Sequence, residues 1–166
     1  MRQEKIKMDT TNMPDKIKEA RKILAEINDL LDEISQWVNN IAYGIITELN
    51  GKWQNLCSKT KTARSKKFID ESTKLLKECD FFRVDIVKKS ESFAEHTRDK
   101  VSLIAELAGD SKEIKSALEE NIKLWNDVVQ PQLDLFYEKT AELESSIMNM
   151  MEFAVQPIEA AAKPCK

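Results

Sequence analysis

The sequence predicts an all-α fold, an elongated antiparallel bundle of three long helices with the third helix kinked at Pro131. Three observations lead to this prediction. Apolar residues recur at alternating steps of three and four, the period of a helix with one buried face. Only 3 glycines and 4 prolines occur among 166 residues, so little interrupts the helices. Short polar turns separate the periodic segments, and short turns make consecutive helices antiparallel.

The first periodic segment predicts a helix from about residue 14 to 49. Asn12–Asp15 carry the start signals, including Pro14 at an early position where its missing N–H costs nothing. Asn50-Gly51 is a natural stop, and we expect the chain to reverse between residues 50 and 64. Three apolar positions in seven suit a bundle helix with more than one neighbour. The predicted buried stripe is Ile17, Ala20, Leu24, Ile27, Leu31, Ile34, Val38, Ile41 and Ile45, widened by Ile23, Leu30 and Trp37.

The second and third helices are separated by the run Gly109–Glu113. Gly109 is expected to close one helix, and Asp110 or Ser111 to cap the next. Pro131 predicts a kink or one-turn break at Val129–Gln132. The expected buried face of the second helix is Phe68, Ser72, Leu75, Cys79, Phe82, Ile86, Phe93, Thr97, Val101, Ile104 and Ala108. That of the third is Ile114, Leu118, Ile122, Trp125, Val129, Leu133, Phe136, Leu143, Ile147, Met150 and Ala154.

Length and charge limit the organisation and the partners. We expect a flexible N-terminal tail at residues 1–12, a single helical-bundle domain at 13–156 and a C-terminal tail at 157–166. The net charge of −3 argues against a general nucleic-acid binder. We expect no signal peptide and no transmembrane segment, because long apolar runs are missing from the sequence as written, and we therefore expect a cytoplasmic protein.

The residue types that carry chemistry are sparse. The single histidine, His96, lacks nearby metal ligands and is expected to face solvent. Cys57, Cys79 and Cys165 have neither disulfide-scaffold density nor metal spacing, so we expect reduced thiols; in an oxidising compartment one pair could bridge. Three scattered glycines cannot build a phosphate loop. The sequence therefore predicts no enzyme activity, no metal and no cofactor.

Two local clusters are candidates for docking. The basic cluster Lys59, Lys61, Arg64, Lys66 and Lys67 is either a polar turn or a contact for an anionic surface. The C-terminal run Ser146–Val155 places Met148, Met150, Met151 and Phe153 around the helix circumference. Methionines adapt to irregular apolar surfaces, so this run is either a docking end or a buried helix end.

The run Lys61-Thr62-Ala63-Arg64-Ser65, followed by Phe68 and a loose amphipathic helix, resembles the core of the phasins. These cytosolic bacterial proteins coat polyester storage granules, and the resemblance covers about residues 53–108. It implies a granule coat and no catalytic residues. This chain departs from the family in having fewer Ala and Gln and in carrying Trp and Cys.

Three kinds of function follow as expectations. The first is a non-catalytic interaction protein, phasin-like, that coats polyester or lipid granules through amphipathic helices. The second is a protein–protein scaffold or coiled-coil oligomerisation module whose partner is another protein or a second copy. The third is a secreted helical carrier or host-factor-binding protein. The regular stripe of the first helix favours a fixed protein interface, and the Ser/Thr-diluted face of the second favours adsorption to a surface.

Overall fold

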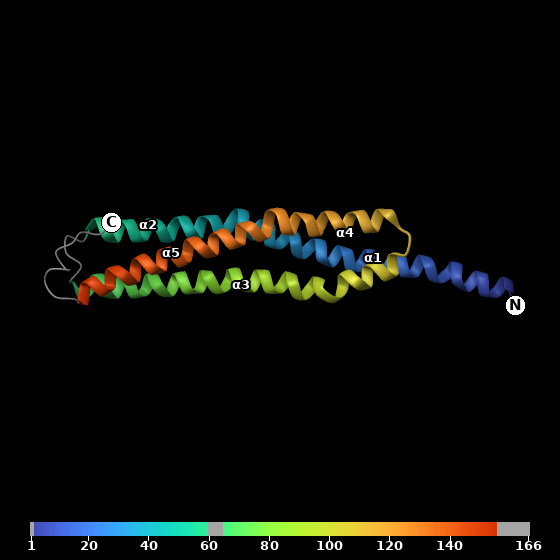
Figure 1. Ribbon diagram of the computed structural model, residues 1–166, viewed down its shortest axis with the longest axis horizontal. Helices are drawn as coiled ribbons and strands as arrows, with labels where there is room; N and C mark the ends of the chain where they lie inside the picture. Colours follow the sequence, from blue (N-terminus) through green and yellow to red (C-terminus); the bar gives the residue numbers. More distant parts are fainter. Residues whose placement is uncertain (1, 60–64, 156–166) are drawn as a thin grey trace. The chain divides into compact units, whose positions relative to one another are not determined.

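A computed structural model describes the backbone of residues 2–59 and 65–155 and the side chains of residues 15–59 and 65–152. Its described elements are all helical (Figure 1), which confirms the predicted all-α fold with three long helical stretches. The first stretch is α1 (Arg2–Trp37), the π-helical turn η1 (Val38–Ala42) and α2 (Tyr43–Lys59). The second is α3 (Lys66–Ala108). The third is α4 (Lys112–Leu124), the π-helical turn η2 (Trp125–Val129) and α5 (Gln130–Val155).

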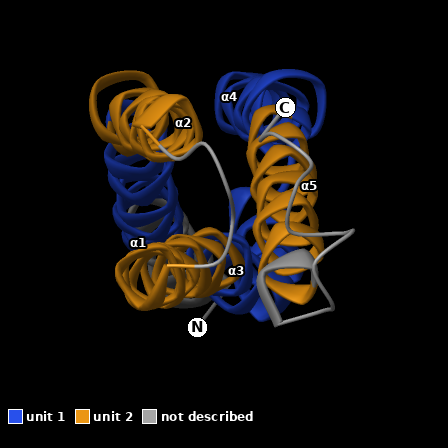
Figure 2. Ribbon diagram, turned by 90° about the vertical axis from the view of Figure 1, so that its left-hand side faces the viewer, with its two compact units in different colours: residues 1–36, 89–131 blue, residues 37–88, 132–166 orange. Residues whose placement is uncertain are grey.

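The chain forms two compact units, each built from one segment of every helical stretch (Figure 2). Unit 1 comprises residues 1–36 and 89–131, and unit 2 comprises residues 37–88 and 132–166. The division into a single domain with two tails stays a prediction. Among the described residues, no helix contains a window long and apolar enough to cross a membrane.

Unit 1 packs its three segments around aliphatic side chains from each of them, such as Ile27, Ile104 and Ile114. The rings of Phe93 and Trp125 stack with centroids 3.9 Å apart. Gln130 Nε2 donates to Ser90 Oγ at 3.3 Å. Ser90 contacts Gln130, and Phe93 contacts Trp125, so residue numbers rise along α3 while those of the third stretch fall. These two segments of unit 1 therefore run antiparallel.

Unit 2 is held together by aromatic side chains. Trp53 lies against Phe68 and Trp37 against Phe82, with ring centroids 6.0 Å apart in both pairs. Phe82 also contacts Phe136 of α5 at 6.5 Å. The first two pairs show that the part of the first stretch from Trp37 to Trp53 runs antiparallel to the first half of α3, as predicted.

The ends of the first helical stretch differ from the prediction. α1 begins at Arg2, before the start signals at Asn12–Asp15, so residues 2–12 have helical backbone where a tail was expected. α2 continues through Asn50-Gly51 to Lys59, so the predicted stop there is wrong. A glycine inside a helix costs about 1 kcal/mol relative to alanine. Continuing the helix buries Trp53 against Phe68, which outweighs that cost.

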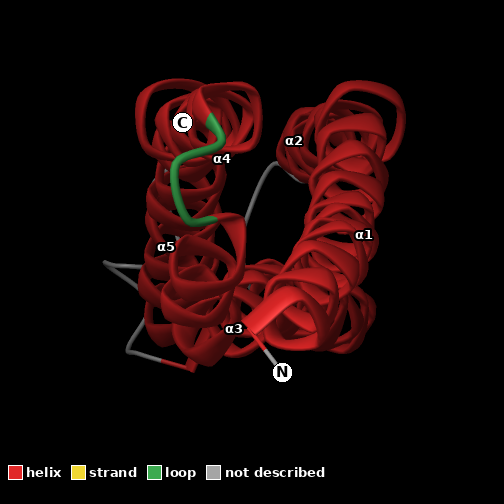
Figure 3. Ribbon diagram, turned by 90° about the vertical axis from the view of Figure 1, so that its right-hand side faces the viewer, coloured by secondary structure: helices red, strands yellow, loops and turns green. Residues whose placement is uncertain are grey.

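The stop predicted after α3 is confirmed. Gly109 adopts a positive φ of 55°, the left-handed conformation that closes a helix and favours glycine. Ser111 is the residue that caps α4, its hydroxyl accepting a hydrogen bond from the Ile114 N–H. Figure 3 shows this turn as the loop between α3 and α4.

The turn η1 changes which residues of the first stretch are buried. The predicted stripe holds for Ala20, Ile27, Leu31, Ile34 and Val38, all buried. A π-helical turn contains one more residue than an α-turn, so the residues beyond it are rotated relative to the core. Ile41 is consequently 48% exposed, against the prediction. From this point on, the core contains another set of residues than the predicted stripe: Ala42, Ile46, Leu49 and Trp53.

The irregularity of the third stretch lies one turn before the predicted position. The Gln130 N–H bonds to the Trp125 carbonyl, and Pro131 follows in the first turn of α5. A proline ring within a helix clashes with the carbonyl four residues earlier, here Asp127. The wider turn at Trp125–Val129 provides room for the ring, which accounts for its location.

Candidate functional site

The methionine cluster lies only partly on the surface. Met148 is 54% exposed, whereas Met150 and Met151 are part-buried beside the fully buried Ile147. The side chain of Phe153 lies outside the described residues. Within the described part of α5, Met148 is therefore the methionine that a partner would reach first.

The predicted basic cluster brackets the connection between α2 and α3. Lys59 ends α2, and Lys66 and Lys67 open α3; all three side chains are exposed. Lys61 and Arg64 lie outside the described residues. Lys59 complements the negative end of the α2 dipole, while Lys66 and Lys67 sit at the unfavourable positive end of α3.

The residues considered for chemistry are not brought together. His96 is exposed on α3, as predicted. In the described segments, no group of three or more His, Cys, Asp or Glu side chains could hold a metal ion. Cys79 is buried in unit 2, and burial, with smaller contributions from Glu144 and Glu78, raises the pKa of its thiol to about 12. A thiol with that pKa is neutral and a poor nucleophile at neutral pH.

The clearest surface feature of unit 2 is a second periodic stripe on α3, which the sequence analysis missed. The core stripe of this segment is Phe68, Ser72, Leu75, Cys79, Phe82 and Ile86, all buried. A parallel set with the same alternation of three and four is Lys74, Lys77, Phe81, Val84 and Lys88, which we name the outer stripe. Phe81 is 75% exposed, the highest value among the large apolar side chains described, and Val84 is 41% exposed.

A helix with apolar residues on two opposite faces needs a reason for the second face. Val87, also exposed, extends the apolar part of the outer stripe by three residues from Val84. Single exposed apolar residues are ordinary on protein surfaces, but residues at helical spacing on one face form a continuous strip. The sequence contained a signal for this second face. Phe81 and Val84 are spaced three residues apart, as neighbouring residues of the core stripe are, but they lie at other positions of the helical repeat.

Ion pairs leave the outer stripe with an excess of positive charge. Glu78 bonds to Lys52 of α2 at 3.0 Å, and Asp80 bonds to Arg83 at 2.8 Å. The remaining charged residues between positions 74 and 88 are Lys74, Lys77, Asp85 and Lys88, and within the described chain none of them forms an ion pair. Between positions 74 and 88 the four basic side chains exceed the three carboxylates by one, so this segment is slightly basic on an acidic protein.

Arg83 ties α3 to α5 on the side away from the outer stripe. Its Nε lies 3.3 Å from Glu144 Oε1, and its guanidinium lies 5.9 Å from the ring centroid of Tyr137. The short hydrogen bond of Arg83 goes to Asp80, so Glu144 Oε1 is buried without a well-aligned donor. Burial raises the pKa of Glu144, and Arg83 only partly offsets this effect. The contacts with α5 fix the rotation of α3 and so keep Phe81 on the outside.

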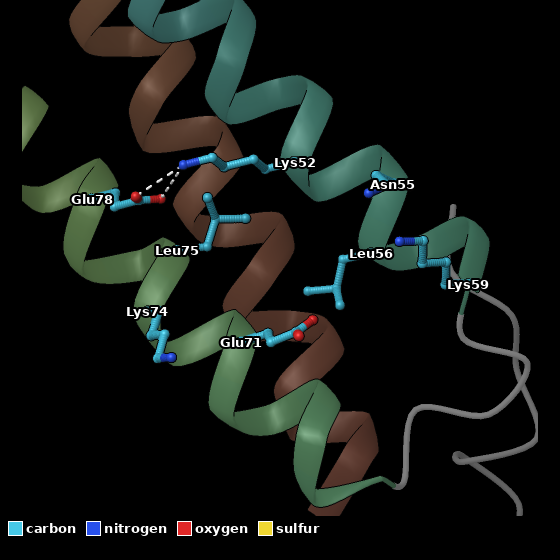
Figure 4. Close-up of a pocket in the computed structure, with 8 residues that line it drawn as sticks. All are labelled: Lys52, Asn55, Leu56, Lys59, Glu71, Lys74, Leu75 and Glu78. Atoms are coloured by element: carbon cyan, nitrogen blue, oxygen red, sulfur yellow. Dashed lines mark hydrogen bonds and ion pairs between the residues drawn. The ribbon is translucent and has the colours of Figure 1, made fainter.

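A groove of about 280 Å³ separates α2 from α3 in unit 2 (Figure 4). Leu56 and Leu75 point into it, and the Lys52–Glu78 pair spans one end. Its remaining lining residues carry both signs of charge: Asn55, Lys59, Glu71 and Lys74. Mixed charge and an ion pair across its mouth give this groove no preference for one class of ligand, so the outer stripe is the better candidate site.

Comparisons of the chain with protein-family models, with curated proteins and with solved structures find no match.

Proposed function

We propose that this protein is a non-catalytic, cytosolic interaction protein that coats an apolar particle, a polyester or lipid granule, through the outer stripe of α3. The observation that carries the proposal is the 75% exposure of Phe81 within a stripe of helical period. A helix with an apolar strip flanked by lysines is suited to lie in the plane of an interface between water and an apolar phase.

The exposed apolar side chains of the outer stripe would supply part of the binding energy. Full burial of a Phe or Val side chain contributes roughly 1.5–3 kcal/mol. Phe81, Val84 and Val87 are 75%, 41% and 39% exposed, so a large part of that contribution is still to be gained on binding. Together the three side chains would contribute roughly 2–5 kcal/mol, which corresponds to weak and readily reversible adsorption.

The core face of the same helix contains an unsatisfied polar group. Ser72 is fully buried, and its hydroxyl has no hydrogen-bond partner among the described residues. A buried unsatisfied hydroxyl costs roughly 1–3 kcal/mol. The closed packing of α3 is therefore less stable than a fully apolar core stripe would make it.

Flotation tests the proposal. Purified protein would be incubated with polyester granules and, separately, with triglyceride droplets stabilised by phosphatidylcholine, and the bound fraction measured after flotation. We expect saturable binding with retained helicity. Replacing Phe81 and Val84 together by Ser should weaken binding at least about tenfold, because two anchoring side chains are lost.

Leu103→Ser is the matched control for this experiment. Leu103 lies on the same helix and is 41% exposed, like Val84, but belongs to unit 1. It should bind like the wild type. Equal loss in both variants would remove the outer stripe from the proposal. No binding to granules or droplets would sink the coating function and favour a protein partner, with Met148 as the first position to test.

A further inference from the structure

We infer that the surface recognised by the outer stripe carries anionic phospholipid headgroups. The inference rests on the proposed function and adds the charge of the bound surface to it. An uncharged droplet would bury Phe81 and Val84, but it would offer no anionic group to the lysines of the stripe.

The placement of the lysines is the first argument. Lys77 lies four residues before Phe81, and Lys88 lies four residues after Val84, so each stands one helical turn from the apolar centre on the same face. Lysine side chains extend their apolar stems along a surface and keep the ammonium group in water. With Phe81 and Val84 in an apolar layer, both ammonium groups reach the level at which phosphate headgroups lie.

The local charge is the second argument. Glu78 pairs with Lys52, which also pairs with Glu48, and Asp80 pairs with Arg83, which also pairs with Glu144. The charged members of the outer stripe itself are Lys74, Lys77 and Lys88. The same spacing continues to Asp70 and Lys67 before Lys74 and to Glu91 after Lys88, so the uninterrupted positive charge is confined to the part from Lys74 to Lys88. The stripe is thus basic where the whole chain, at −3, is acidic. The repulsion between the acidic chain and an anionic surface is therefore smaller at this face than the net charge alone would suggest.

Charge also argues against a second copy of the chain on this face. In a parallel pairing of two α3 helices, Lys77 would face the other Lys77. In an antiparallel pairing centred on Phe81 and Val84, Lys77 would face Lys88 of the other copy. Like charges at facing positions are destabilising, so an anionic occupant fits better in either case.

Vesicle binding tests the inference. Two vesicle types would be compared: phosphatidylcholine alone, and phosphatidylcholine containing phosphatidylglycerol. We expect tighter binding to the anionic vesicles and weakening with added salt. Each lysine near an anionic surface contributes about fivefold in partitioning, so Lys77→Gln with Lys88→Gln should weaken binding roughly 25-fold.

The control variant removes the same charge elsewhere. Lys115 and Lys123 are exposed on α4 in unit 1, and their joint replacement by Gln should leave anionic binding at the wild-type level. All four positions are on the surface, so far-UV circular dichroism should show the same helicity in both variants.

The outcomes separate the two proposals. Equal binding to both vesicle types, together with binding to granules or neutral droplets, overturns the inference and leaves the coating function standing. Binding to neither vesicles nor droplets overturns both. Preference for anionic vesicles that survives Lys77→Gln with Lys88→Gln, or is lost equally in the α4 control, would show that the outer stripe does not recognise the headgroups.

Discussion

Two carboxylates, Glu26 and Glu144, show how one residue's surroundings set the sign of its contribution to stability. Glu26 accepts a hydrogen bond from Lys100 at 3.0 Å, which lowers its pKa and makes its charged form the favoured one. Glu144 is mostly buried, and burial raises its pKa despite the nearby Arg83. The first group favours folding when ionised, the second when protonated.

The pH dependence of unfolding should reveal the Glu144 effect. A carboxyl whose pKa is raised on folding stabilises the native state below its ordinary value of 4.5, and this stability is lost as pH rises through the raised pKa. Glu144→Gln cannot ionise. We expect the stability of this variant relative to wild type to increase as pH rises from about 4 to 7, measured by urea denaturation.

Glu142→Gln provides the comparison for that measurement, because Glu142 is an exposed carboxyl on the same helix. Its pH profile should follow the wild type. A Glu144→Gln variant that loses stability relative to wild type as pH rises would show that the Arg83 contact outweighs burial.

The two buried polar side chains of the described core are Ser72 and Thr140, and they differ in their hydrogen bonding. Thr140 donates to the Phe136 carbonyl at 2.7 Å, whereas the Ser72 hydroxyl has no partner among the described residues. Ser72→Ala removes an unsatisfied group and should raise the free energy of unfolding by about 1 kcal/mol. Thr140→Val breaks a hydrogen bond and should lower it. Urea denaturation measures both, and a destabilised Ser72→Ala would mean that its hydroxyl has a partner.

At the scale of an element, the turn η1 places one extra residue in the first helical stretch. Without that residue, the buried positions would follow the alternating three-and-four spacing of a regular α-helix. These positions are Val38, Ala42, Ile46, Leu49 and Trp53. The buried set is thus the same one that a continuous α-helix one residue shorter would present. The exposure of Ile41 is a consequence of the extra residue and not of a weak core.

Deleting Asn40 tests this account of η1. Asn40 is exposed in η1, so its removal should convert the turn to α-helix and keep the unfolding free energy within about 1 kcal/mol of wild type. Deleting the exposed Asn50 from the regular helix α2 should instead rotate Trp53 by about 100° out of the core and cost roughly 3–5 kcal/mol. Far-UV circular dichroism during urea unfolding would measure both. Equal losses would show that η1 is not an insertion in an α-helical register.

At the scale of the whole molecule, the two units share one unbroken helix. α3 spans Lys66–Ala108 and contributes its first half to unit 2 and its second half to unit 1. Helix formation is cooperative, because interior residues each add a hydrogen bond whereas new ends lose them. Unfolding one unit alone would create such ends in the middle of α3.

We therefore expect one unfolding transition. Trp125 reports on unit 1 and Trp53 on unit 2. In variants that retain only one of these tryptophans, the others being Phe, fluorescence midpoints in urea should coincide with each other and with the circular dichroism midpoint. Separate midpoints would show that the units unfold independently and that the chain behaves as two domains.

The sequence by itself determined the fold class, the stop at Gly109 and most of the core. These features depend on local spacing: the three-and-four period in α3 identifies Phe68, Leu75 and Phe82 as buried without knowledge of their neighbours. Of the candidate site, none of the five residues of the outer stripe was predicted from the sequence; the basic cluster that was predicted lies at the start of α3 and before it. Phe81 and Val84 escaped prediction, because the face opposite a core stripe is ordinarily polar.

Only the tertiary structure decided where α2 ends, which residues η1 exposes and that Phe81 lies on the surface. The stop signal at Asn50-Gly51 is worth about 1 kcal/mol, less than the burial of Trp53 against Phe68. Ile41 and Ala42 are both apolar, and the rotation imposed by packing beyond Val38 selects between them. Local signals are weak and short-ranged, so where several apolar residues compete for the same core, the packing of distant segments decides which of them is buried.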